Sequence, residues 1–377
     1  MRRFLFLLTG LGLTFFAITT ASWLQAPSSD AVAIDPDALA AARDAGETAG
    51  RLRLDGEDRS PSSLEEVRAI WNRAELKAVR ERLEGYLAEV EPRQPAVLHA
   101  MLSVVCRRQR DGEAAVRHGR SAAELMPTNA EVHHVYARAI VERMRGGGMM
   151  AALRNASTWR AELRTTIELD PSNTDARLEE LLFYAFVPPA MGGDRDRARV
   201  LLAELSELDP GRASAMEARM LQNDGDLEGA REVIDRRLSG EPGDAEVLLA
   251  LADLLEEEQD FELADEAIQA AMNARPAEAG WRATYKRARS QLDEEREGDL
   301  VLTLSLLDEY AEGAPRSDYM PTPAQALLTR ARALSRLGRM DEAEAAYRSA
   351  LDADEEVDES GEVADELREA GVNLGQS

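Results

Sequence analysis

The spacing of two prolines constrains this chain more than any other feature of its sequence. Pro242 and Pro276 lie 34 residues apart (276 − 242 = 34), and two stripes of small and aliphatic residues at helical spacing lie between them. Gln259 and Asp260 separate the two stripes. Helices this short bury little apolar surface alone, but they can stack on copies of themselves. The stretch therefore predicts one helix-turn-helix unit of an array.

Prolines that can close a helix recur along most of the chain, 32 to 44 residues apart. They are Pro92, Pro127, Pro171, Pro210, Pro242, Pro276 and Pro315. We found no alternating strand pattern of useful length. The sequence therefore predicts an all-α solenoid of about seven helix-turn-helix units over residues 62–355. An acidic tail, residues 356–377, holds an amphipathic segment that would cap the last apolar surface.

The unit between the two prolines resembles the tetratricopeptide repeat. In that family small residues lie where the two helices touch, larger apolar residues fill the groove between them, and a proline closes the second helix. The corresponding residues here are Ala252, Leu255, Ala264, Ile268, Ala271 and Pro276. The resemblance covers Ala96 to Ala350. It implies a scaffold for protein–protein interactions, with no catalytic residue to assign.

The turn from Pro188 to Asp194 adds a second, more specific resemblance. Two prolines forbid helix continuation, two glycines permit a tight turn, and Asp194 can cap the following helix. This turn is similar to one in exported bacterial tetratricopeptide proteins, and also to one in the helical accessory subunit of some TRAP-type solute transporters. No cysteine follows the N-terminal segment for lipid attachment, which weakens the transporter interpretation.

The first 21 residues have the pattern of an export signal. Arg2 and Arg3 precede an apolar run from Phe4 to Ile18, and small residues follow it. The 15-residue run is short for a membrane span, although an uncleaved inner-membrane anchor stays an alternative. Residues 22–61 are interpreted as a polar spacer, partly helical. We expect a periplasmic or secreted protein.

Composition limits the chemistry that we expect. The net charge of −26 argues against nucleic acid as a partner. Cys106 is the single cysteine, so the chain has no intramolecular disulfide and no cysteine-based zinc site. Its apolar neighbours predict a buried, inert thiol. Adjacent residues His133 and His134 would point about 100° apart on a helix, a poor arrangement for one metal ion. The sequence predicts no enzyme, cofactor or metal.

Two sets of residues are candidate binding sites. In the tetratricopeptide fold the first helix of each unit lines a concave groove, where alignment places Arg107, Arg108, His134, Arg138, Arg219, Asn223, Arg332 and Arg336. Guanidinium groups suit carboxylates, so the groove could hold an acidic segment or a C-terminal carboxylate of a partner protein. The alternative is that these arginines pair with acidic residues of their own surface. The second set lies in two predicted docking loops and consists of Met149, Met150, Pro188, Pro189 and Met191. The alternative is that these methionines fold back on the core.

Overall fold

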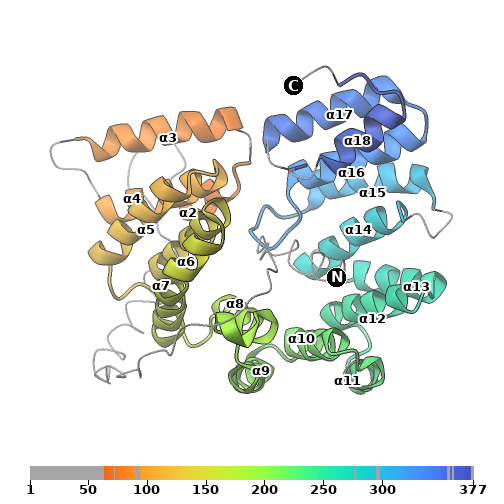
Figure 1. The fold of residues 1–377 in the computed structure, drawn as a ribbon, viewed down its shortest axis with the longest axis horizontal. Coiled ribbons are helices and arrows are strands. Elements are labelled where there is room, and N and C mark those ends of the chain that lie inside the picture. Colours follow the sequence, from red (N-terminus) through yellow and green to blue (C-terminus); the bar gives the residue numbers. More distant parts are fainter. Residues whose placement is uncertain are drawn as a thin grey trace. The chain divides into compact units, whose positions relative to one another are not determined.

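A computed structural model describes residues 63–71, 73–89, 94–275, 277–293, 298–354, 357–358 and 361–374. The predicted signal at 1–21 and the predicted spacer at 22–61 lie outside these ranges. The chain divides into two compact units, residues 1–70 with 74–201 and residues 71–73 with 202–377, and each is described by itself (Figure 1). Both units are helical where they are described, which confirms the all-α prediction.

The first unit holds the short helix α2 and six longer helices. They are α2 (Leu64–Arg68), α3 (Arg73–Leu87), α4 (Pro95–Arg108), α5 (Gly112–Leu125), α6 (Ala130–Gly146), α7 (Gly148–Leu169) and α8 (Thr174–Phe186). The 3-10 helix η3 (Pro189–Met191) follows, and α9 (Arg195–Leu208) crosses the boundary between the units at Leu201.

The second unit continues the alternation of helices and turns as far as the described C-terminus. Its helices are α10 (Pro210–Asn223), α11 (Leu227–Gly240), α12 (Ala245–Glu257), α13 (Phe261–Met272), α14 (Glu278–Ser290), α15 (Leu300–Gly313), α16 (Pro323–Arg336), α17 (Met340–Ala353) and α18 (Glu362–Glu369). From α4 to α17 the described helices form seven successive pairs, as the proline spacing predicts.

Short polar side chains begin many of these helices. In each case the side-chain oxygen accepts a hydrogen bond from a backbone N–H of the first turn, at Asp111, Asn129, Asn173, Asp209, Asp226, Asp244, Asp260 and Asp299. Such a cap is worth about 1 kcal/mol, because it satisfies a donor that the helix itself leaves unpaired. The caps explain why helices and turns alternate so regularly.

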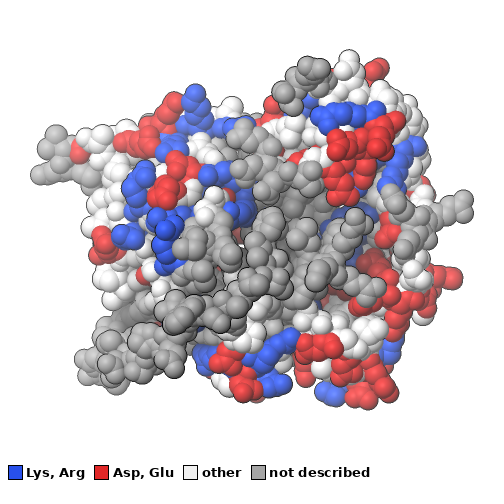
Figure 2. Space-filling model, viewed as in Figure 1, with Lys and Arg blue, Asp and Glu red and all other residues white. Residues whose placement is uncertain are grey.

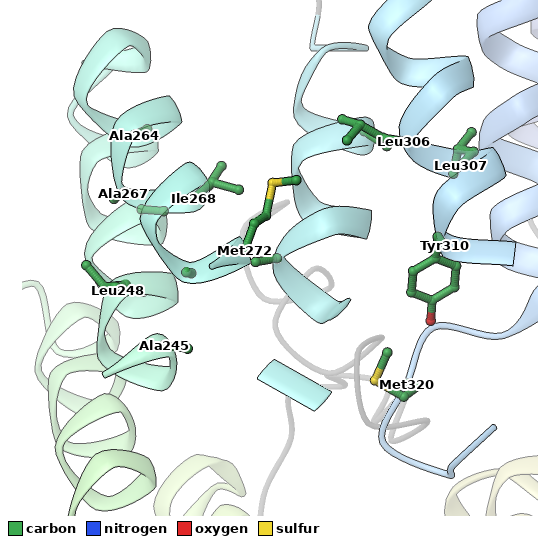
Figure 3. Packing of buried hydrophobic residues seen from close by; sticks show 14 of the residues in the cluster. Ala245, Leu248, Ala264, Ala267, Ile268, Met272, Leu306, Leu307, Tyr310 and Met320 are labelled. Atoms are coloured by element: carbon green, nitrogen blue, oxygen red, sulfur yellow. The ribbon is translucent and has the colours of Figure 1, made fainter. Parts of the chain in front are cut away.

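Small residues at the contacts between helices let the pairs stack. Ala264 and Ile268 on α13 are fully buried against Leu248 of α12, and Tyr310 of α15 belongs to the same apolar cluster (Figure 3). First helices also contact the next first helix along the second unit, α10 with α12, α12 with α14, and α14 with α16. Within the second unit each helix pair therefore packs on the next, as a solenoid requires.

The described C-terminal end is closed by α18, which packs against α16. Its buried residues Val363, Ala364 and Leu367 join the cluster that contains Leu334 of α16, while Asp365 and Glu369 are exposed. The amphipathic segment predicted in the tail therefore does cover the last helix pair.

Cys106 lies in α4 with no exposed surface. Burial raises the pKa of its thiol to about 11, so the thiolate is scarce at neutral pH. The predicted buried, inert thiol is confirmed. In the described part of the chain, no helix is long and apolar enough to cross a membrane.

Candidate protein-binding site

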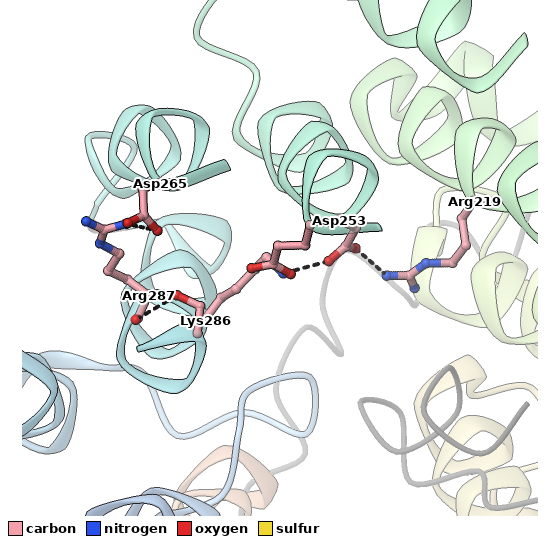
Figure 4. Close-up of polar contacts among 7 residues, drawn as sticks. Arg219, Asp253, Asp265, Lys286 and Arg287 are labelled. Carbon is pink, nitrogen blue, oxygen red and sulfur yellow. Dashed lines mark hydrogen bonds and ion pairs between the residues drawn. The ribbon is translucent and has the colours of Figure 1, made fainter. Parts of the chain in front are cut away.

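One candidate groove residue of the second unit, Arg219, belongs to an ion-pair ladder, which we define as Arg219, Asp253, Glu256 and Lys286. Arg219 of α10 donates to Asp253 of α12 at 3.3 Å, and Lys286 of α14 donates to Asp253 at 2.8 Å and to Glu256 at 2.6 Å (Figure 4). The ladder thus connects three successive first helices. Two positive and two negative groups alternate along it, so it carries no net charge.

The ladder keeps its charges at neutral pH. Burial raises the pKa of Asp253, but the positive charges of Lys286 and Arg219 outweigh burial and hold that pKa below its ordinary value. For Lys286, burial lowers the pKa, and the carboxylates of Asp253 and Glu256 outweigh it in the opposite direction. Both groups are therefore ionised, and each depends on the other to remain so in a half-buried place.

Two further sets of ion pairs follow the same pattern. Glu246 of α12 lies between Arg212 of α10, at 3.7 Å, and Arg282 of α14. Near the C-terminus, Arg332 of α16 binds Glu366 of α18 and lies 3.4 Å from Glu362. Several partners, such as Arg219 with Asp253 and Arg332 with Glu366, are 34 residues apart. Opposite charges separated by one repeat length are a sequence signal that could have identified these pairs in advance.

In the first unit, two of the predicted groove residues share one carboxylate. Arg138 of α6 donates to one oxygen of Glu179 on α8 through Nε at 3.0 Å and Nη2 at 2.9 Å, and His134 contacts the same oxygen at 3.3 Å. Burial raises the pKa of Glu179, but these two neighbours outweigh it and lower the pKa to about 2. His133 faces elsewhere, toward Glu162 at 2.6 Å and the carbonyl oxygen of Pro127 at 3.0 Å.

The other groove residues occupy several different helices. Arg107 and Arg108 end α4, and Arg108 donates to the carbonyl oxygen of Arg68. Asn223 is the last residue of α10, and Arg336 of α16 donates to the carbonyl oxygen of Leu292 at 2.7 Å.

For Arg138, Arg219 and Arg332 the structure therefore shows the alternative interpretation, in which the arginines pair with acidic residues of the chain itself. Each pairs with a carboxylate of a neighbouring helix. An acidic partner that binds them must compete with that internal carboxylate. Because the internal carboxylate is already held in place, it loses little entropy on pairing and is a strong competitor.

Charge is unevenly distributed among the helices of the second unit. The second helices α13 and α15 each contain three acidic residues and no basic one, whereas the first helix α16 contains three arginines and no acid. Figure 2 shows acidic and basic side chains exposed together on one face of the molecule. The first helix α12, by contrast, contains four acidic residues and no basic one, and its Asp253 pairs with Arg219 of α10 and Lys286 of α14.

The predicted docking loop between α8 and α9 is a tight turn. The N–H of Met191 donates to the carbonyl oxygen of Pro188 at 2.8 Å, and Gly192 has a φ of 100°, which favours glycine. A methyl group at Gly193 would lie 1.7 Å from the carbonyl oxygen of Val187. Asp194 accepts two backbone N–H groups at 3.0 Å each, so it caps α9 as predicted. Pro188 and Pro189 are exposed and Met191 is half-buried.

The other predicted docking loop is not a loop. Met149 and Met150 belong to the first turn of α7, which begins at Gly148, and only Gly147 separates α6 from α7. The run of glycines is compatible with a longer break, but Gly147 has a φ of −99° and a ψ of 1°, which any residue can adopt, so the chain passes from α6 to α7 through this one residue. The placement of these two methionines in an exposed loop is therefore corrected.

Comparison with known proteins agrees with this architecture. The family model of the tetratricopeptide repeat matches residues 245–278 and 324–357, which are α12 with α13 and α16 with α17. No curated protein matches the chain.

Solved structures of similar fold include yeast Tom70. That similarity has a TM-score of 0.58 at 15% identity and covers 89% of this chain and 69% of that one. IFIT1 bound to Gppp-AAAA gives a TM-score of 0.41 at 15% identity, covering 90% and 80%. The Cut9–Hcn1 heterotetramer of the APC/C gives 0.39 at 12% identity, covering 81% and 54%. At 15% identity the likeness to Tom70 concerns the fold alone.

The helical fold, the ion pairs between first helices and the match to the family model agree with one another. Repeats of this kind point to a scaffold for protein–protein interactions. The chain is an all-α solenoid that contains tetratricopeptide repeats at residues 245–278 and 324–357.

Proposed function

We propose that this protein is an exported adaptor of the cell envelope that holds a partner protein along its helical repeats. The observation that carries the proposal is the succession of helix pairs from α4 to α17, with tetratricopeptide repeats among them, combined with the export pattern of residues 1–21. Such an array offers a long surface built from many similar units, which suits the binding of an extended segment.

The proposed ligand is an acidic segment or a C-terminal carboxylate of the partner. Arginine is the residue that binds carboxylates in pairs of parallel hydrogen bonds, and the first helices carry many arginines. In the proposed groove, Arg107, Arg108, His134, Arg138, Arg219, Asn223, Arg332 and Arg336 are the contacts. A partner carboxylate there would exchange with an internal one, so binding would be weak and sensitive to salt.

A second proposed function is that of an accessory subunit of a periplasmic solute transport system. The observation that favours it is the turn from Pro188 to Asp194, whose sequence is similar to that of such subunits. The two proposals differ in the partner. An adaptor of general type binds envelope proteins, whereas an accessory subunit binds the solute-binding protein or the membrane subunits of a transporter.

The experiment is affinity capture from an envelope extract, with the chain from Ser22 onward as bait. Bound proteins are identified by mass spectrometry at low and at high salt. A partner that is reproducibly captured at low salt and lost at high salt supports the adaptor, and capture of transporter components supports the accessory subunit. Bait that retains no protein under either condition contradicts both.

Export is tested separately. Fractionation of cells that express the full chain, followed by N-terminal sequencing, should place the protein outside the cytoplasm. A new N-terminus near residue 22 shows cleavage, and an intact N-terminus in the membrane fraction shows an anchor. Recovery in the cytoplasm alone contradicts the proposed location.

A further inference from the structure

Arg160, a half-buried arginine of the first unit, forms no ion pair within the described chain, whereas Arg138 and Arg219 each pair with a carboxylate. Arg160 of α7 lies over the ring of Phe183 of α8, with its guanidinium carbon 5.4 Å from the ring centroid. Its Nε is buried and has no hydrogen-bond partner among the described residues. By contrast, the buried Glu180, nearby in sequence to Phe183, lies 3.9 Å from Arg197. The guanidinium group of Arg160 is therefore half-buried, and among the described residues its stacking on Phe183 is the contact that holds it.

A second unsatisfied donor lies beside the same ring. Trp159 is 1% exposed, and its ring meets that of Phe183 edge to face, with centroids 5.2 Å apart. Within the described chain, its indole N–H has no acceptor. A buried N–H without an acceptor costs about 1–3 kcal/mol, so an acceptor that reached either donor would be stabilising. Neither the Nε–H of Arg160 nor the indole N–H of Trp159 has a hydrogen-bond acceptor among the described residues.

The turn between α8 and α9 adjoins this cluster. A methyl group at Gly192 would lie 3.4 Å from Cζ of Phe183 and 3.8 Å from Nη1 of Arg160. Pro188 and Pro189, in the same turn, are exposed. A chain segment that lies along this turn can therefore bring an acceptor to the guanidinium group.

We propose that Arg160, stacked on Phe183 beside the turn of residues 188–193, binds a carboxylate of a partner protein. The carboxylate comes from an acidic side chain or from a C-terminus. The inference rests on the proposed function and names a site for it. It differs from the groove residues in one respect, because no carboxylate among the described residues occupies the donors of Arg160, whereas Arg138 and Arg219 must first release theirs.

Stacking on Phe183 suits this role. An aromatic face holds the planar guanidinium in one orientation while its edge remains able to form two parallel hydrogen bonds to a carboxylate. The aromatic surroundings also weaken competition from water, so one charge-assisted bond contributes more here than on an exposed helix. Trp159 supports Phe183 from its edge, and its fluorescence should report ligand binding.

Fluorescence anisotropy with labelled peptides tests the proposal. One capped hexapeptide alternates serine and glutamate, a second alternates serine and glutamine, and a third alternates glycine and serine and ends in a free carboxylate. We expect the intact protein to bind at least one carboxylate peptide about tenfold more tightly than the glutamine peptide. The first and third peptides distinguish side-chain from C-terminal carboxylates. Equal binding of all three overturns the proposal.

The matched variants are Arg160→Gln and Arg164→Gln. Arg164 is exposed one turn further along α7 and has no ion pair in the described chain, so its loss controls for net charge. Arg160→Gln should abolish the tenfold preference, and Arg164→Gln should retain it. If circular dichroism shows that Arg160→Gln has lost helix, Arg160→Lys replaces it. That variant keeps the charge but loses the planar fork, and an unchanged preference would overturn the proposal.

Affinity capture distinguishes failure of this inference from failure of the proposed function. Partners captured equally by the intact protein and by Arg160→Gln leave the adaptor role standing and contradict the role of Arg160. An intact protein that captures no partner contradicts the adaptor role, and the peptide preference alone then decides the carboxylate site.

Discussion

The guanidinium group of Arg138 on α6 donates two hydrogen bonds to a single oxygen of Glu179 on α8, at 3.0 and 2.9 Å. His134 contacts the same oxygen at 3.3 Å. Glu179 as a whole residue is 7% exposed, so its carboxylate has little water to replace these partners. The contact joins two successive first helices through opposite charges.

Glu179→Gln should therefore destabilise the first unit by about 3 kcal/mol, because it leaves two cationic or polar donors facing a neutral amide in a buried place. The measurement is the urea midpoint followed by circular dichroism. Glu168→Gln, on an exposed position of α7, is the control and should change the midpoint little. Equal midpoints for the Glu179 variant and the native chain would contradict the inferred contribution.

The same contact predicts how stability responds to acid. The pKa of Glu179 is about 2 in the folded protein, against an ordinary value of 4.5 for the same carboxyl in an unfolded chain, so the unfolded chain binds the proton more readily. The contribution of Glu179 to stability is complete above pH 4.5 and is lost as the pH falls toward 2. Melting temperatures across this interval should fall less steeply for Glu179→Gln than for the native chain. Parallel curves would be inconsistent with a lowered pKa.

A histidine pair responds at higher pH. The Nδ1 atoms of His99 on α4 and His118 on α5 lie 2.9 Å apart, and burial followed by the charge of the other histidine lowers the pKa of His118 to about 4. The unfolded state then binds more protons below pH 6.5, so stability is full above that value and declines as the pH falls toward 4. His118→Gln should flatten this decline in thermal melts between pH 7 and 5, and an NMR titration of the imidazole should give the low pKa directly.

Two glycines should respond in opposite directions to replacement by alanine. A methyl group at Gly112, the first residue of α5, would lie 2.7 Å from the Cα atom of Arg143 on α6, and backbone cannot move aside easily. Gly112→Ala should cost about 1–3 kcal/mol. At Gly85, within α3, the methyl group meets no atom within 4 Å, so alanine should stabilise by up to about 1 kcal/mol. Urea midpoints that shift in the same direction would contradict the close approach of α5 and α6.

The ion-pair ladder of the second unit offers a test of coupling. Asp253→Asn keeps the shape of the side chain but leaves Arg219 and Lys286 without their shared charge. We expect a loss of about 1 kcal/mol, since the side chains are partly exposed, and a smaller additional loss when Lys286→Met is combined with it. Strong salt should shrink the difference. Glu266→Gln, an exposed position on α13, is the control, and full additivity in the double-mutant cycle would refute the coupling.

The positions of the helices could be predicted from the sequence because the signals that fix them are local. Pro242 and Pro276 bound one helix pair, and Asp260 begins the second helix of that pair by accepting a backbone N–H three residues later. Asp194 caps α9 in the same way. The predicted loop at Met149 and Met150 is wrong because these residues follow three glycines, which are compatible either with a break or with a helix end, and the structure has a helix there.

The partners of the charged side chains were decided only by the tertiary structure. Arg138 and Glu179 are 41 residues apart in the sequence, and Arg219 and Asp253 are 34 apart. A chain with 71 acidic and 45 basic residues allows many other pairings. Which pairings form depends on how each helix is rotated against the next, and the packing of small and apolar residues between the helices sets that rotation. The rotation of α7 against α8 likewise places Arg160 over the ring of Phe183.

The sequence by itself therefore determined an array of helix pairs, through periodicity, prolines and caps that act within a few residues. Only the stacked fold decided which arginines are satisfied internally, because that depends on distances between helices far apart in the chain.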